Sequence, residues 1–168
     1  FVLKNGRLVS LFPSPNASEA MEYNITFGLN RAVYTAVGCG ISAEVTLAVA
    51  GGDNCQIREI NIRNSDGGEC ELVCLFEPVL APPRDYAAHE TFSKLGIETY
   101  KRGGTLMIGR RQRPGAQQLH MAVALSCEND YSFDTSRPAA LGRGGKDNIS
   151  HAMQRSAQST LGDVFPDT

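Results

Sequence analysis

Apolar and polar side chains alternate along much of the chain, and this alternation predicts β-strands. The clearest run is Ile41–Val49, in which the odd-numbered residues are apolar and Ser42, Glu44 and Thr46 lie between them. A period of two places one set of side chains on a buried face and the other in water. Asn5-Gly6, between two short apolar pairs, is typical of a tight hairpin turn. Other early strands are predicted at residues 2–3, 8–9, 23–29, 31–37 and 56–63.

Two segments depart from simple alternation. Ile57 has the opposite parity to Ile60 and Ile62, which predicts a β-bulge near Arg58-Glu59. Residues 70–80 are apolar on both faces, which predicts a central strand covered on both sides. Glu77 would then be partly buried and would need a partner, because an unpaired buried carboxylate is costly.

The second half of the chain is predicted to continue as short strands. Proline-containing residues 81–85 end the central strand as a loop, and further strands follow at residues 95–100, 105–110 and 119–126. The tail from Ser136 is predicted to be loop, with one short strand near residues 161–164. Helical periodicity is almost absent. Eight or nine strands separated by turns predict a single all-β domain over residues 1–168, an antiparallel sandwich.

Charge and length narrow the classes of function. The chain has 168 residues, 16 basic and 18 acidic, for a net charge of −2, which argues against a nucleic-acid partner. No apolar run reaches the roughly 20 residues of a membrane span, so no membrane contact is expected. A basic cluster is interpreted as the solvated edge of a hairpin, because no aromatic residues interleave with it. Its members are Lys101, Arg102, Arg110, Arg111 and Arg113.

The cysteines indicate neither a metal site nor a disulfide framework. There are five, with no Cys-x-x-Cys pair and no Cys/His cluster. Cys70 and Cys74, four residues apart in a predicted strand, would lie about 13 Å apart, too far for a disulfide. The odd number predicts reduced, buried thiols in a cytoplasmic protein. The chain begins with Phe1 rather than Met, and we expect it to be a piece of a longer polypeptide.

Catalytic motifs are not evident. His89, His120 and His151 are far apart in the sequence, and no Gly-x-Ser-x-Gly elbow or phosphate-binding loop is present. Gly142-Arg143-Gly144-Gly145 is interpreted as a tight turn. The residues therefore predict a β-sandwich without catalytic apparatus.

Three segments, taken in order, resemble one known family. They are the run Leu75-Phe76-Glu77-Pro78-Val79-Leu80-Ala81-Pro82, the His-x-x-Phe-Ser-Lys-Leu pattern from His89 to Leu95, and the turn Leu141-Gly142-Arg143-Gly144. Together they resemble the glycosyltransferase-36-like proteins grouped in glycoside hydrolase family 94. That family includes cellobiose phosphorylase, the β-1,2-oligoglucan phosphorylases and cyclic β-1,2-glucan synthase, and the β-1,2-glucan branch is the most similar.

The resemblance implies an N-terminal β-supersandwich, similar in fold to galactose mutarotase. It also implies a separate (α/α)6 barrel of the same polypeptide that carries the catalytic Asp and the site for inorganic phosphate, the co-substrate. The chain itself is then expected to be inactive and to hold no catalytic residue, cofactor or metal. The implied partners are the barrel, a β-glucan oligosaccharide and a second copy in a homodimer.

Arg84, Asp85, Tyr86 and His89 are the candidate carbohydrate contacts. They combine donors, acceptors and a stacking ring at a predicted strand end, a mixture that suits hydroxyl-rich ligands. The favoured alternative is that these residues cap a loop or dock the barrel. Glu77 and His89 could also be each other's polar partners inside the fold.

Two other functions remain open. A stand-alone carbohydrate-binding module is disfavoured by zero Trp and only five Tyr, because flat sugar-binding faces rely on aromatic platforms. A complete small mutarotase-like enzyme would need a His and a carboxylate in one cleft, and more strands than 168 residues readily supply.

Overall fold

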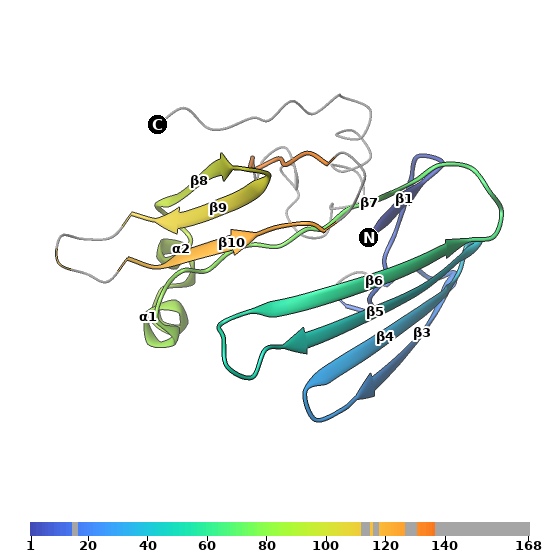
Figure 1. The fold of residues 1–168 in the computed structure, drawn as a ribbon, viewed down its shortest axis with the longest axis horizontal. Coiled ribbons are helices and arrows are strands. Elements are labelled where there is room, and N and C mark those ends of the chain that lie inside the picture. The colour runs from blue at the N-terminus through green and yellow to red at the C-terminus, as the bar shows by residue number, and fades with distance from the viewer. Residues whose placement is uncertain (15–16, 112–114, 116–117, 127–130, 137–168) are drawn as a thin grey trace. The chain divides into compact units, whose positions relative to one another are not determined.

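The computed structural model describes residues 1–14, 17–111, 115, 118–126 and 131–136. They fall into two compact units, the first covering residues 1–75 and the second starting at Phe76. The predicted all-β fold is confirmed: the described strands form three antiparallel sheets (Figure 1). The strands are β1 (Val2–Lys4), β2 (Arg7–Val9), β3 (Met21–Phe27), β4 (Arg31–Gly38), β5 (Ile41–Val49), β6 (Gln56–Asn64), β7 (Cys70–Leu72), β8 (Ile97–Arg102), β9 (Thr105–Arg110) and β10 (His120–Val123). The helices are α1 (Pro83–Ala88) and α2 (Glu90–Ser93).

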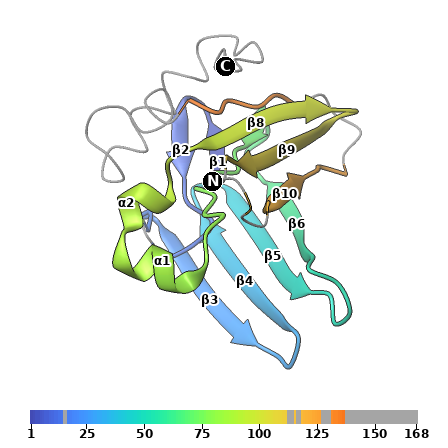
Figure 2. The same ribbon diagram turned by 90° about the vertical axis from the view of Figure 1, so that its left-hand side faces the viewer.

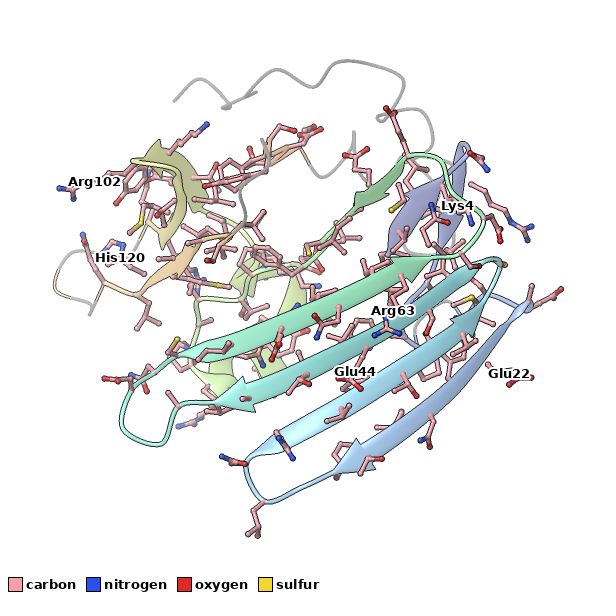
Figure 3. All side chains as sticks on the ribbon, turned by 45° about the vertical axis from the view of Figure 1, so that its right-hand side comes forward. Lys4, Glu22, Glu44, Arg63, Arg102 and His120 are labelled. Carbon is pink, nitrogen blue, oxygen red and sulfur yellow. The ribbon has the colours of Figure 1, made fainter. Side chains whose placement is uncertain are left out.

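A four-stranded sheet, in the order β3-β4-β5-β6, forms the larger part of the first unit. Its strands follow one another through short turns and run side by side (Figure 2). The predicted alternation holds along β5, where Ile41 and Val45 are buried and Glu44 is exposed. Glu44 and Arg63 share the exposed face (Figure 3).

A second sheet of the first unit, in the order β2-β1-β7, packs on the buried face of the larger one. The predicted Asn5-Gly6 turn joins β1 to β2, with φ of 51° and 72° at its two residues. Both values are positive, as this hairpin turn requires. The core between the sheets consists of Val2, Leu11, Ile41, Ala43 and Val45, with Phe12 and Tyr34 in edge-to-face contact at its border.

A buried lysine ties the two sheets of this unit together. Lys4 on β1 is only 6% exposed, and its Nζ donates hydrogen bonds to the carbonyl oxygens of Cys39 at 3.1 Å and Gly40 at 3.3 Å. The same Nζ lies 2.9 Å from a carboxylate oxygen of Asp66. Lys4 therefore holds the β4–β5 turn and the segment after β6 against β1, and its charge is satisfied inside the protein, as a buried ammonium requires.

The second unit consists of the two short helices and an antiparallel sheet in the order β10-β9-β8. Gly103 and Gly104, with φ of 53° and 80°, make the turn between β8 and β9. Leu106 and Ile108 on β9 are buried. In β10, Met121 and Val123 are half-buried, whereas Leu125, two residues beyond the strand, is exposed.

The predicted bulge near Arg58-Glu59 is wrong. The pairing of β5 with β6 runs without interruption from Ile41 opposite Asn64 to Val49 opposite Gln56. Ile57 instead lies on the solvent face, 57% exposed. A single exposed isoleucine costs less than an interrupted ladder, because a bulge leaves a residue unpaired.

The predicted central strand at residues 70–80 is also wrong. The strand ends at Leu72, all three residues of β7 are exposed, and β7 pairs with β1 alone among the described strands. The short β1 offers few partners, and Pro78 lacks the N–H that a longer ladder would need. The predicted loop at residues 81–85 gives way to α1, since Pro83 suits the first turn of a helix.

The cysteine predictions are partly confirmed. Cys39, Cys55, Cys70 and Cys74 are free thiols, but only Cys39 is half-buried and the other three are exposed. The expectation of buried thiols is therefore wrong for these three. Cys127, the Leu141–Gly144 motif and the predicted strand near residues 161–164 lie outside the described residues.

Gly40 should tolerate a side chain less well than Gly6. Both have positive φ, 67° and 72°, but a Cβ at Gly40 would lie 1.8 Å from Oδ2 of Asp66, whereas a Cβ at Gly6 meets nothing within 4 Å. Gly6→Ala should cost about 1–2 kcal/mol of unfolding free energy from backbone strain alone. Gly40→Ala should cost at least about 1 kcal/mol more, because Asp66 must leave Lys4. Equal losses in urea denaturation would contradict the Lys4–Asp66 contact.

Asp66 should stabilise the fold only while its carboxyl is ionised. Hydrogen bonds from Lys4 and then Ser65 hold the pKa of Asp66 below the ordinary value of 3.8. A lowered folded pKa means that the stabilisation is complete above the ordinary pKa and is lost as the pH falls through the folded pKa. The stability advantage of the unmodified chain over Asp66→Asn should therefore be largest near neutral pH and shrink below about pH 4.

Lys4→Met is the control for this titration. In that background, Asp66→Asn should change the stability much less, because Lys4, the largest cause of the lowered pKa, is gone and only the hydrogen bond from Ser65 remains. If Asp66→Asn lowered the free energy of unfolding equally with and without Lys4, the stabilising effect of Asp66 would come from another contact.

Candidate functional site

All four predicted contact residues lie on α1 or at its end. Pro83 occupies the first turn, where the N–H groups of Asp85 and Tyr86 donate to the carbonyl of Pro82. The Asp85 carboxylate is also in this turn, where the helix dipole favours negative charge. Arg84 and Asp85 are exposed, and Tyr86 is half-buried.

His89 ends α1 and begins α2. Its N–H donates to the carbonyl of Asp85 at 2.9 Å, and its own carbonyl accepts from Ser93 at 3.0 Å. The imidazole is edge-to-face with the ring of Phe92, with ring centres 6.0 Å apart. Since His89 is exposed and Phe92 is 68% exposed, the two form a small aromatic surface that water reaches. His89 was a predicted carbohydrate contact, whereas Phe92 was not among the predicted contacts.

A charged network fixes Tyr86 beside these rings. The Tyr86 hydroxyl donates to Glu90 at 3.1 Å, and Lys94 donates to the same Glu90 oxygen at 2.8 Å. Lys94 also pairs with Glu77 at 2.8 Å, so Glu77 has its partner there although its side chain is 41% exposed. Neither Glu90 nor Lys94 was predicted from the sequence. Glu90 follows Tyr86 by four residues and Lys94 follows Glu90 by four, and this spacing is the signal that could have revealed them, because side chains four apart meet on a helical surface.

The network changes the acidity of its members. Hydrogen bonds to Glu77 and then Glu90 raise the pKa of Lys94, so the ammonium is held charged. The bond from Lys94, followed by that from Tyr86, lowers the pKa of Glu90. The bond to Glu90 is the main cause that raises the pKa of the Tyr86 phenol. At neutral pH the phenol is therefore a hydrogen-bond donor to Glu90.

Arg110 of β9 anchors the helical segment to the sheet of the same unit. Its guanidinium donates to the carbonyl of Leu80 at 3.2 Å and to that of Phe92 at 3.3 Å. Arg111 pairs with Glu98, and Lys101 and Arg102 are exposed, as a solvated hairpin edge predicts. Arg110 differs because it is half-buried and holds main-chain oxygens. Arg113 lies outside the described residues.

Comparison with known families identifies the fold to which this site belongs. The family model described as "Glycosyl hydrolase 94, supersandwich domain" matches residues 3–165. The chain belongs to the glycosyl hydrolase 94 family. This confirms the resemblance drawn from the sequence motifs and makes the chain a non-catalytic domain of a glycosyl hydrolase 94 enzyme. No curated protein and no solved structure matches it.

Metal-binding groups, membrane-spanning helices and depressions are the other features, besides α1 and α2, that could mark a site in the described residues of the glycosyl hydrolase 94 domain. These residues contain no group of three or more His, Cys, Asp or Glu side chains that could hold a metal ion. Within the same residues no helix is long and apolar enough to cross a membrane. A depression of about 650 Å³ lies beside the β1–β2 turn and β7 in the first unit. Its lining consists of Leu3, Asn5, Gly6, Glu69, Cys70 and Glu71, none of which is a predicted contact.

Glu90→Gln should lower the pKa of Tyr86 toward the ordinary value of 10.0, because the carboxylate that raises it is removed. The shift can be followed by NMR titration of the Tyr86 ring carbon. Glu98→Gln is the matched control, since Glu98 pairs with Arg111 on the β-sheet instead. An unchanged Tyr86 titration in Glu90→Gln would show that the hydrogen bond to Glu90 does not form in solution.

Proposed function

We propose that this domain contributes to the saccharide site and to barrel docking in a phosphorylase or glycosyltransferase acting on β-glucans, with β-1,2-linked glucan as the favoured substrate. In this proposal the catalytic acid and the inorganic phosphate co-substrate belong to the (α/α)6 barrel of the same polypeptide, and the two units described here form one domain. A cytoplasmic location belongs to the proposal too, since three exposed thiols suit a reducing compartment. We also propose that the enzyme forms a homodimer.

The exposed helical segment supports the docking part of this proposal. No residue of α1 is buried, although a helix of only six residues gains little stability from its own hydrogen bonds. Such a helix is stabilised chiefly by packing against another surface. We infer that the barrel supplies this surface.

The aromatic pair supports the saccharide part. His89 and Phe92 present ring faces and edges to solvent, and sugar C–H groups pack on aromatic rings. The guanidinium of Arg84 and the carboxylate of Asp85, both exposed on α1, offer a donor and an acceptor for hydroxyl groups. This combination of rings and charged groups at one segment is the observation that carries the proposal.

Phe92→Ala and Arg84→Ala in the whole enzyme should raise KM for β-1,2-gluco-oligosaccharides while leaving kcat nearly unchanged. Each loses a contact of roughly 1 kcal/mol, which corresponds to about a fivefold rise in KM. Steady-state phosphorolysis measures both constants. Arg102→Ala on β8 is the matched control, because Arg102 is exposed on the hairpin rather than on the helical segment.

The outcomes separate the two roles. An unchanged KM together with a lowered melting temperature of the whole enzyme would assign the segment to docking and reject the saccharide contact. Isothermal titration of this chain alone with the same oligosaccharides tests the alternative function: binding without the barrel would identify a stand-alone carbohydrate-binding module.

A further inference from the structure

Among the described strands, β6 lies at one edge of its sheet. It is nine residues long and pairs with β5, and no other described strand pairs with it (Figure 1). An open edge carries unpaired N–H and C=O groups, which form a template for another strand. Proteins usually block such edges, so an edge of this length needs an explanation.

The hydrogen bonds at both ends of the ladder identify the backbone groups that face outward. Ala50 N–H donates to the carbonyl of Cys55, and Ser65 N–H donates to that of Gly40. In an antiparallel pair, residues that bond to the partner alternate with residues that face away. The odd-numbered residues of β6 therefore bond to β5. The even-numbered ones, including Arg58, Ile60 and Ile62, direct their N–H and C=O groups to the open edge.

We propose that β6 pairs with β6 of a second copy, antiparallel about a twofold axis through Asn61, to form one continuous sheet across a homodimer. The proposal rests on the homodimer named above and assigns its interface. The outward backbone groups pair with one another in this register: Arg58 lies opposite Asn64 of the second copy, and Ile60 lies opposite its Ile62.

Side-chain charge selects this register. On the exposed face of the sheet, Glu59 of each copy falls directly opposite Arg63 of the other, which gives two cross-strand ion pairs. The Arg63 guanidinium points to the open face and makes no hydrogen bond or ion pair within the described residues (Figure 3). On the other face, Ile60 and Ile62 are half-buried at the border of the core, and pairing them covers apolar surface.

The opposite edge of the sheet lacks this complementarity. β3 also has an open edge among the described strands, and its outward groups belong to Met21, Tyr23, Ile25 and Phe27. Its one charged residue is Glu22. Two copies of β3 would therefore form no ion pair in any register, so charge favours β6.

Reversing each charge tests the register. Glu59→Arg and Arg63→Glu should each weaken the dimer roughly tenfold, since each places two like-charge pairs opposite one another. The double variant Glu59→Arg/Arg63→Glu should restore most of the affinity, because it exchanges the partners. Sedimentation velocity over a dilution series of the full chain measures the dissociation constants, and circular dichroism confirms folding.

Controls on the same face separate pairing from net charge. Glu44→Arg and Arg31→Glu make the same charge changes on β5 and β4, away from the edge, and should leave the dimer unchanged. Asn61→Cys should also cross-link on oxidation, with Cys39, Cys55, Cys70, Cys74 and Cys127 replaced by Ser. Facing residues at the axis have Cα atoms about 4.5 Å apart, within the range of a disulfide. Thr46→Cys on β5 should not cross-link.

The failures are distinguishable. A chain that stays monomeric would overturn this interface, because the proposed pairing uses residues of this chain alone. A dimer that is insensitive to both single reversals, or that the double variant fails to restore, would overturn the β6 pairing while leaving the homodimer in place. Cross-linking of Thr46→Cys as readily as Asn61→Cys would also reject the register.

Discussion

The first unit depends on an ammonium group placed between main-chain oxygens and a carboxylate. Lys4 projects from a strand of only three residues, which by itself offers few hydrogen bonds. Because its Nζ reaches Cys39, Gly40 and Asp66, it connects three segments that are distant in sequence. A hydrophobic residue at this position would bury as much surface but would remove the donor to the Cys39 carbonyl and the cation that pairs with Asp66. The same contact requires glycine at position 40, since a Cβ there would occupy the place of the Asp66 carboxylate.

The second unit shows how a short helical segment is held in a protein made mainly of strands. Neither α1 nor α2 is long enough to be stable alone. Arg110 holds their segment through carbonyl oxygens, and the charges of Lys94, Glu90 and Glu77 fix one surface of it. Tyr86 is held in this network, whereas the rings of His89 and Phe92 remain exposed. The helical segment therefore combines a rigid base with an accessible aromatic surface, which is a useful property for docking or for contact with a sugar.

Membership in the glycosyl hydrolase 94 family gives these features their context. A domain without catalytic residues can contribute through its surfaces, and two surfaces of the described residues carry the proposals made above. The helical segment and the edge of β6 lie in different units of the chain and differ in kind. The first offers side chains, and the second offers backbone groups whose pairing is selected by charge. The exposed residues of the helical segment and of the β6 edge can each be substituted without altering the buried residues of the first unit.

The sequence by itself determined the all-β class, the β1–β2 turn and the burial of alternate residues along β5. These features depend on neighbours in the chain, because side-chain alternation and turn conformation are local properties. The family was also evident from short motifs, of which His89, Phe92 and Lys94 belong to the helical segment.

Only the tertiary structure decided where strands find partners. The apolar residues 70–80 predicted a central strand, but β1 is short and Pro78 cannot donate, so β7 stops at Leu72. Ile57 predicted a bulge, but the ladder between β5 and β6 keeps its register and leaves this side chain in water. The partners of Lys4 and the exposure of Cys55, Cys70 and Cys74 were equally hidden. Each depends on contacts between residues far apart in the chain, and local pattern carries no information about such contacts.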